Sequence, residues 1–244
     1  MIEFQDVTRS YGAKVAVDRL KLTVGEGELF ALLGPNGAGK TTSIKMLVGL
    51  LRPDSGSVKV CGHDVARQTR LATRMLGYVP DQPFLYDKLT GREFLDFAGE
   101  MRGLDRTATN DCIARECDNF DLAEFVDNLT ETYSHGMKQR LVFASAFLHN
   151  PAVLVIDEPM VGLDPRSVRL VKDLLRSRAA QGTTVFMSTH TLTVAEEIAD
   201  RIGIVDAGRL HFLGTVPQLQ KELSSEHKAL EPLFLELTGG DNGR

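Results

Sequence analysis

Hydrophobic and polar residues alternate in steps of two over the first 24 positions of the chain. This period is typical of strands that bury one face, and Tyr11-Gly12 interrupts it as a turn between two strands. Residues 29–33 then form an uninterrupted apolar run of strand length, and residues 43–51 continue with a helical period. The pattern predicts an antiparallel β portion at the N-terminus, followed by a buried strand and a helix.

The helical period dominates from residue 84 to residue 150. Thr90-Gly91-Arg92-Glu93 is a capping-box pattern at the start of a predicted helix, and Ser134 is a candidate cap of another helix. We therefore expect an all-helical insertion between strands, the alternative being that these helices only cover a sheet. Between the first helix and this block we expect a strand at residues 57–61. A helical stretch to about residue 74 and a short strand at residues 75–80 follow it.

Strands and helices alternate again after residue 150. The strands are predicted at residues 152–156, 183–188, 202–205 and 210–213, with helices at 167–180 and from 193 onward. A continuous apolar strand is typical of a parallel sheet that is buried on both faces. The last segment is predicted as helix to about residue 230, with disorder at residues 239–244.

A glycine-rich loop joins the apolar strand at 29–33 to the helix after it. It matches the pattern G-x-x-x-x-G-K-[ST], in which backbone N–H groups and a helix N-terminus surround phosphate oxygens. Lys40 is expected to reach the β- and γ-phosphates and the Thr41 hydroxyl to hold Mg²⁺. The residues of this predicted nucleotide site are Gly34, Pro35, Asn36, Gly37, Ala38, Gly39, Lys40, Thr41 and Thr42.

The fold class that follows is α/β: a P-loop NTPase core with a mostly parallel sheet flanked by helices. An antiparallel β portion precedes this core, and an all-helical subdomain is inserted into it. We expect one domain made of a first core part, a helical subdomain, a second core part and a C-terminal tail, at residues 1–83, 84–150, 151–216 and 217–244.

Two adjacent carboxylates follow the apolar strand at residues 152–156. A strand beside the phosphate-loop strand would bring Asp157 to the Mg²⁺ shell, and Glu158 would polarise a water in line with the γ-phosphate. Such a pair is costly to bury without cations or hydrogen-bond donors. In isolation the pair would be read as a surface turn, but together with the phosphate loop it predicts hydrolysis of a bound nucleotide.

The composition excludes several classes of protein. The 43% hydrophobic and 25% charged residues are ordinary for a globular domain, and the net charge of −5 argues against non-specific nucleic-acid binding. Cys61, Cys112 and Cys117 show no CxxC spacing, which argues against structural disulfides and a zinc site. The cysteine usage fits a reducing cytosol, no uncharged apolar run has the length of a membrane span, and the start lacks a signal-peptide pattern.

With these motifs in place, the chain resembles the nucleotide-binding domain of ATP-binding cassette (ABC) transporters over essentially its whole length. Residues 133–140 resemble the family's signature motif, usually written LSGGQ. Ser134 and Gly136 match it, whereas Tyr133, His135 and Met137 stand in place of Leu, Gly and Gln. The resemblance implies that Ser134, His135, Gly136 and Met137 act in trans, facing the γ-phosphate that another subunit holds.

Three more residues match positions of this family. Asp164, in Gly162-Leu163-Asp164, resembles the D-loop, which joins two subunits. His190 resembles the switch histidine that contacts the γ-phosphate and positions the attacking water, and Tyr11 stands where the family has an aromatic residue that stacks on adenine. The alternatives are a structural histidine and a simple turn tyrosine.

One position departs from the family pattern. The family has a glutamine directly after its Tyr-x-Pro strand end, whereas Tyr78-Val79-Pro80 is followed by Asp81 and then Gln82. Either Gln82 reaches Mg²⁺ and water after a one-residue shift, or Asp81 takes that place as a charged oxygen ligand. The sequence slightly favours Gln82.

The resemblance implies an ATPase that uses ATP and Mg²⁺ to drive transport, with features closer to the export branch than to nutrient import. It implies two ATPase subunits, identical or different, that bind two ATP molecules head to tail. Separate membrane-spanning subunits would dock near the helical insertion and residues 81–86, which puts the chain at the cytoplasmic face of the cell membrane. The alternatives are a non-transport ABC ATPase acting on nucleic acid, ribosomes or a protein complex, and a binding-only subunit, against which Glu158 and His190 argue.

Overall fold

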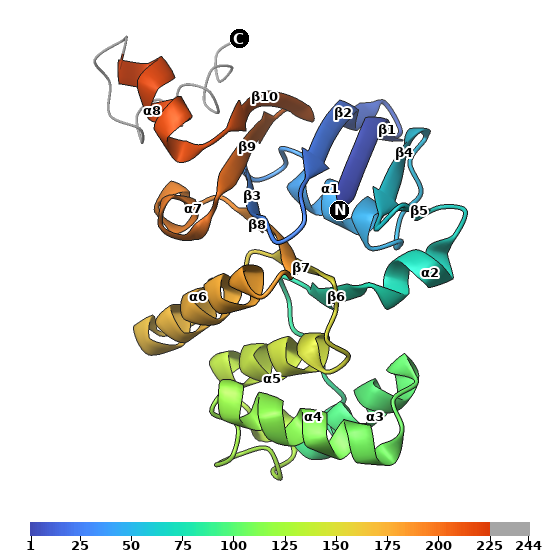
Figure 1. Ribbon diagram of the computed structural model, residues 1–244, viewed down its shortest axis with the longest axis vertical. Coiled ribbons are helices and arrows are strands. Elements are labelled where there is room, and N and C mark those ends of the chain that lie inside the picture. The colour runs from blue at the N-terminus through green and yellow to red at the C-terminus, as the bar shows by residue number, and fades with distance from the viewer. Residues whose placement is uncertain (225–244) are drawn as a thin grey trace.

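The structure, a computed structural model, describes residues 1–224 and contains two sheets (Figure 1). The smaller sheet is antiparallel throughout, with the strand order β2-β1-β4-β5. Its first two strands confirm the N-terminal hairpin, since Tyr11 pairs with Lys14 across the predicted turn. The strands are β1 (Ile2–Tyr11), β2 (Lys14–Val24), β4 (Ser55–Val60) and β5 (His63–Asp64).

The larger sheet has the order β10-β9-β3-β8-β7-β6, and all its neighbours are parallel except the edge strand β10. Every residue of β3, β7 and β8 is buried, as expected for strands covered on both faces. The strands are β3 (Leu29–Leu33), β6 (Leu76–Val79), β7 (Val153–Asp157), β8 (Thr184–Thr189), β9 (Arg201–Asp206) and β10 (Arg209–Gly214). The parallel sheet and the hairpin that joins β9 to β10 confirm the predicted α/β fold.

Successive residues of β3 contribute to two different cores. Phe30 and Leu32 pack with α1 (Lys40–Leu47) between the two sheets, where the Phe186 ring lies 5.5 Å from Phe30 and 6.1 Å from Phe4. The other residues of β3 pack on the opposite face, which is covered by α6 (Pro165–Ala180) and α7 (Leu192–Ile198). The phosphate-loop strand is thereby fixed from both sides.

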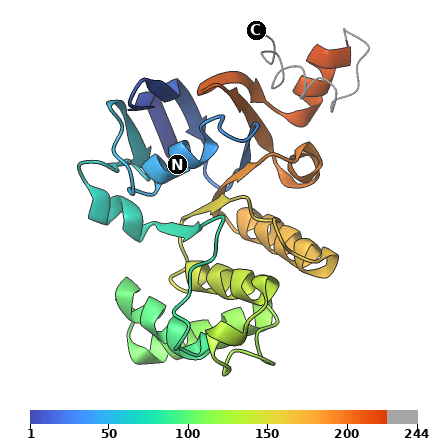
Figure 2. The ribbon, with the colours of Figure 1, turned by 180° about the vertical axis from the view of Figure 1, so that it is seen from behind.

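Three helices lie together beyond β6 and β7, at the end of the molecule opposite the smaller sheet (Figures 1 and 2). They are α3 (Gly91–Arg102), α4 (Arg106–Asn119) and α5 (His135–Phe147), with a short 3₁₀ turn at Thr130–Thr132. The predicted capping box is present, since Thr90 Oγ1 accepts from the Glu93 N–H and Glu93 Oε2 accepts from the Thr90 N–H. The rings of Phe120, Phe143 and Phe147 pack inside this group.

Several element boundaries differ from the sequence interpretation. The helix expected at 43–51 ends at Leu47, because Gly49 turns the chain with a φ of +79°. The helix expected up to residue 74 is the single short helix α2 (Thr69–Arg74), and the two-residue strand β5 was not predicted. The last described helix is α8 (Val216–Ser224), so the predictions for residues 225–244 lie outside the described residues.

Candidate active site

The glycine-rich loop connects β3 to α1 in a conformation that requires its glycines. Gly39 has a φ of +106°, and a Cβ there would lie 2.4 Å from the Ala16 carbonyl oxygen. A Cβ on Gly34 would lie 2.2 Å from the Val205 carbonyl oxygen. Both contacts are with backbone atoms that cannot easily move, so only glycine fits at these two positions. Lys40 follows as the first residue of α1, as the motif predicts.

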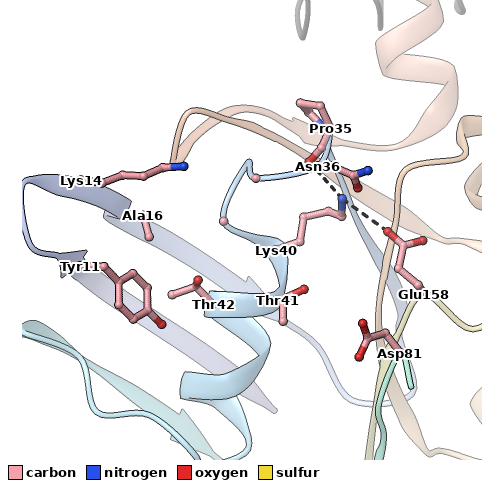
Figure 3. A pocket seen from close by; sticks show the side chains of 12 residues that line it. Tyr11, Lys14, Ala16, Pro35, Asn36, Lys40, Thr41, Thr42, Asp81 and Glu158 are labelled. Atoms are coloured by element: carbon pink, nitrogen blue, oxygen red, sulfur yellow. Dashed lines mark hydrogen bonds and ion pairs between the residues drawn. The ribbon is translucent and has the colours of Figure 1, made fainter. Parts of the chain in front are cut away.

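A cavity of about 320 Å³ opens beside this loop (Figure 3). Its walls come from the β1–β2 hairpin, the loop with the start of α1, and the residues that follow β6 and β7. The lining residues are Tyr11, Lys14, Ala16, Pro35, Asn36, Gly37, Gly39, Lys40, Thr41, Thr42, Asp81 and Glu158. This volume suits a small-molecule ligand. The structure thus brings together most of the predicted nucleotide-contacting residues, although Gly34, Ala38, Gln82, Asp157 and His190 do not line the cavity.

Lys40 places a buried ammonium group at the centre of the loop. Its Nζ donates to the carbonyl oxygens of Gly34, at 2.7 Å, and Pro35, at 3.2 Å. The same nitrogen lies 3.5 Å from Glu158 Oε1 (Figure 3). The Lys40 side chain is only 6% exposed, so its charge acts in a site with little screening by water.

Glu158 joins the end of β7 to the end of β8. Its Oε2 lies 3.0 Å from His190 Nδ1, and its backbone N–H donates to Ser188 Oγ at 3.1 Å. Glu158 also has a φ of +51°, an unusual conformation for a residue with a side chain. The carboxylate therefore lies between the ammonium of Lys40 and the imidazole of His190, which is half exposed.

Asp157 is completely buried, and one of its oxygens has no hydrogen-bond partner. Ser188 Oγ donates to Oδ1, whereas Oδ2 is unpaired. Burial raises the pKa of this carboxyl, and the nearby hydroxyls of Ser188 and Thr41 lower it, while the charges of Asp81 and Glu158 raise it further. An unpaired buried carboxylate oxygen next to a hydroxyl suits a hard cation that prefers oxygen ligands.

The described residues contain no cluster of three or more His, Cys, Asp or Glu side chains that could hold a metal ion. Mg²⁺ typically takes one or two protein carboxylates together with phosphate and water oxygens. Asp157, with its unpaired oxygen, and Thr41, whose hydroxyl lies near it, are the residues whose oxygens would fit such an ion.

Asp81 and Gln82 lie differently with respect to the cavity. Asp81 follows β6 and lines the cavity, where Figure 3 shows it below Glu158 and facing Thr41. Gln82 is exposed and is not among the lining residues. The first residue after Pro80 thus lines the cavity, and the second does not. The geometry favours Asp81 over the Gln82 that the sequence slightly favours.

The signature segment lies at the start of α5, outside the cavity. Ser134 is exposed and caps this helix, and its Oγ accepts from the Met137 N–H at 3.3 Å. The His135 ring contacts the loop after Glu158, with Nε2 lying 3.3 Å from the Val161 carbonyl oxygen. Gly136, which is partly buried, lies in the first turn of the helix.

Asp164 acts as the N-cap of α6. Its Oδ1 accepts from the N–H groups of Arg166 and Ser167, both at 3.0 Å, and its Oδ2 accepts from Ser167 Oγ at 2.6 Å. These hydrogen bonds hold the pKa of the Asp164 carboxyl below its ordinary value. The structure thus gives this residue a capping role within the chain.

Sequence reasoning missed three residues at this site. Lys14 and Ala16 line the cavity because the hairpin pairing brings β2 beside Tyr11. Ser188 contacts both acidic residues, because Asp157 and Ser188 are register partners in the parallel sheet. The position of Ser188 near the end of a predicted strand, two residues before His190, was the available signal.

The chain is similar to known proteins over most of its length. Residues 17–161 match the family model described as "ABC transporter". The chain is 39% identical over 224 residues to the daunorubicin/doxorubicin resistance ATP-binding protein DrrA of Streptomyces peucetius, an alignment covering 92% of this chain and 68% of that protein. It is also 39% identical over 208 residues to Nod factor export ATP-binding protein I of Paraburkholderia xenovorans, covering 85% and 68%.

A solved structure gives the same result for the fold. The structure of the ATP-binding subunit of an ABC transporter superimposes with a TM-score of 0.90 at 31% sequence identity, covering 97% of this chain and 99% of that chain. The names of the two relatives, drug resistance and Nod factor export, agree with the resemblance to the export branch. The chain therefore belongs to the ABC transporter family, as an ATP-binding subunit with the family's ATPase domain.

Proposed function

We propose that this chain hydrolyses Mg²⁺-bound ATP to drive export through separate membrane-spanning subunits. The observation that carries the catalytic part is the arrangement of Lys40, Glu158 and His190, in which one carboxylate lies 3.5 Å from an ammonium and 3.0 Å from an imidazole. Lys40 is the first residue of α1, Glu158 follows β7 and His190 follows β8. The ends of these elements meet at one edge of the parallel sheet.

The cavity supports binding of a nucleoside triphosphate. Lys40 and the backbone of residues 34–39 would surround the phosphates, and the exposed ring of Tyr11 would stack on adenine at the other end. Thr41 and Asp157 would hold Mg²⁺, with Asp81 close enough to contribute a further carboxylate oxygen. When bound, this ion would neutralise charge on the phosphate oxygens.

Glu158 is the candidate that polarises the attacking water. Its carboxylate can accept the proton of that water, and His190 can hold both the carboxylate and the terminal phosphate in place. Lys40, buried beside Glu158, would stabilise the charge that develops on the phosphate oxygens in the transition state.

The position of Ser134 supports a two-subunit arrangement. Its hydroxyl lies at the exposed N-terminus of α5, outside the residues that line the cavity. A helix N-terminus favours anions, so Ser134 and the segment after it would complete the cavity of a second subunit. Two copies, identical or not, would then hold two ATP molecules head to tail.

An exposed apolar surface supports docking of a membrane-spanning partner. Phe84 and Met101 are each 72% exposed, and the Tyr86 ring packs against Phe84 and Phe97 at 5.6 and 5.8 Å. Exposed apolar patches mark sites of contact with other proteins, and Phe84 lies three residues after Asp81 of the cavity. No helix in the described part of the chain combines the length and the apolar character of a membrane span. The proposed role in export implies separate membrane-spanning subunits, with this chain at the cytoplasmic face.

The test of the proposal has two parts. The purified chain should release phosphate from ATP in the presence of Mg²⁺ and lose this activity in EDTA or in Lys40→Ala, whereas Lys138→Ala should retain it. For the transport part, substitution of Phe84 and Met101 by glutamate should abolish co-purification with the membrane-spanning subunit and leave phosphate release by the isolated chain unchanged. Activity that does not need Mg²⁺ or Lys40 would refute the catalytic assignment.

A further inference from the structure

Arg9 lies against the aromatic ring of Tyr11 at the mouth of the cavity. Its Cζ is 5.3 Å from the centroid of that ring, within the range of a cation–π interaction. Tyr11 lines the cavity and Arg9 does not. Tyr11 is 49% exposed, so the part of its ring that the guanidinium does not cover is open to a ligand.

Arg9 is itself held in place by the turn after α1. Its Nη1 donates to Asp54 Oδ1 at 2.6 Å and to the Arg52 carbonyl oxygen at 3.3 Å. The second oxygen of Asp54 accepts from the Ser10 N–H at 2.7 Å. Asp54 thus fixes both the guanidinium and the backbone next to Tyr11, so the ring and its support form one ordered unit.

We propose that Arg9 is a positioning residue for the base of the nucleotide and acts through Tyr11. This inference rests on the proposed function, in which Tyr11 stacks on adenine. A cation on one face of the ring draws its π electrons toward that face, which reduces repulsion between the other face and an electron-rich purine. The same contact restrains the half-exposed Tyr11 ring before the base arrives, so less side-chain freedom is lost on binding.

The experiment compares a ligand that has a base with one that has none. Dissociation constants of ATP and of inorganic triphosphate, both with Mg²⁺, are measured for the full chain and for Arg9→Gln, Arg9→Lys, Tyr11→Ala and the double variant Arg9→Gln/Tyr11→Ala. The matched control is Arg70→Gln, which changes an exposed arginine of α2 that does not line the cavity. Melting temperatures without ligand report any loss of folding.

Arg9→Gln should weaken ATP binding about two- to fivefold and leave triphosphate binding unchanged. Arg9→Lys keeps the charge but not the planar group, so it should retain part of the contribution that Arg9 makes to ATP affinity. If Arg9→Gln does not fold, Arg9→Lys still allows ATP and triphosphate affinities to be compared. In the Tyr11→Ala background, Arg9→Gln should cause no further loss of ATP affinity.

Equal weakening of ATP and triphosphate would overturn the inference, and so would an undiminished loss of ATP affinity in the Tyr11→Ala background. The inference would also be overturned if Tyr11→Ala left ATP affinity unchanged. In that case, binding of ATP and triphosphate by the wild-type chain would still support the phosphate site. Failure of the wild-type chain to bind either ligand would instead overturn the proposed function.

Discussion

The imidazole of His135 fills the space beside Gly162. A Cβ on Gly162 would lie 2.5 Å from His135 Cδ2 and 2.7 Å from Nε2, and the glycine has a φ of +74°. His135 stands where the resemblance expects a glycine, and the loop that follows Glu158 has a glycine opposite it. The two residues connect the signature segment at the start of α5 with the loop that leads to Asp164.

This contact predicts a destabilised Gly162→Ala variant that a second substitution partly rescues. The variant should lose about 2–4 kcal/mol of unfolding free energy, from the strained φ and from the clash with the ring. Gly182→Ala is the matched control, because Gly182 has a φ of +98° and no atom within 4 Å of the added Cβ, so it should lose only the backbone part.

Urea denaturation of the Gly162→Ala, His135→Ala and double variants measures the coupling. His135→Ala should restore part of the stability that Gly162→Ala removes. Strictly additive effects in this cycle would mean that the ring and the glycine do not interact.

Asp81 is predicted to support catalysis and Gln82 is not. Asp81→Ala should lower the rate of ATP hydrolysis and raise the Mg²⁺ concentration needed for half-maximal rate, because a carboxylate near the metal oxygens is lost. Gln82→Ala should behave like the unmodified chain, since its side chain does not line the cavity. Titration of activity with MgCl₂ distinguishes the two, and the opposite result would restore the interpretation that the sequence slightly favours.

A buried ion pair links the helical block to α6. Glu116 is fully buried and accepts from Arg178 Nη2 at 3.0 Å, from Arg115 Nε at 2.7 Å and from Asn119 Nδ2 at 3.0 Å. Arg178→Met should therefore cost about 1.5–3 kcal/mol of unfolding free energy, because it removes one of the two cationic partners of a buried carboxylate while Arg115 and Asn119 remain.

The control for that variant is Arg166→Gln, which breaks an exposed pair with Asp121 at 3.1 Å. It should change the unfolding free energy by at most about 1 kcal/mol. Chemical denaturation of both variants gives the comparison, and equal losses would show that burial does not decide the value of these pairs.

His149 is predicted to make stability depend on pH. Its Nε2 donates to the Leu76 carbonyl oxygen at 3.0 Å, and burial together with the charge of Arg102 lowers its pKa from 6.5 to about 4. Between these two values the unfolded chain binds the proton and the folded chain does not, so stability is lost as the pH falls from about 6.5 to about 4.

The loss at this one residue is at most about 3 kcal/mol. The experiment is urea unfolding at pH 7 and pH 4.5 for the unmodified chain and for His149→Gln, which cannot take up a proton. The variant should lose less stability on acidification. If the unmodified chain and His149→Gln lost the same stability on acidification, groups other than His149 would account for the loss.

The parts of this molecule that follow from local sequence were predictable. The hairpin around Tyr11, the apolar strand β3 and the capping box of Thr90 and Glu93 each depend on residues a few positions apart. The ends of the elements were harder to predict. The helical pattern continues to residue 51, whereas α1 ends before Gly49, which has a positive φ.

At the site, the motifs gave the phosphate loop and the residues after β7 and β8. The motifs could not predict the residues whose positions depend on contacts between distant segments. Asp81 lines the cavity because β6 pairs with β7, Ser188 meets Asp157 because their strands are register partners, and Arg9 covers Tyr11 because Asp54 holds it from the turn after α1. The contacts themselves join residues that are far apart in the sequence, so a motif search does not find them.

The most direct test of the account is Glu158→Gln, which removes the charge of the proposed base and keeps its size. ATP turnover by the purified chain and the affinity for ATP are measured together, with Glu196→Gln as a control at another glutamate of the described chain. We expect turnover to fall at least about a hundredfold while ATP still binds and holds two copies together. Unchanged turnover in Glu158→Gln would contradict the assignment of this carboxylate, and with it the catalytic centre proposed for this chain.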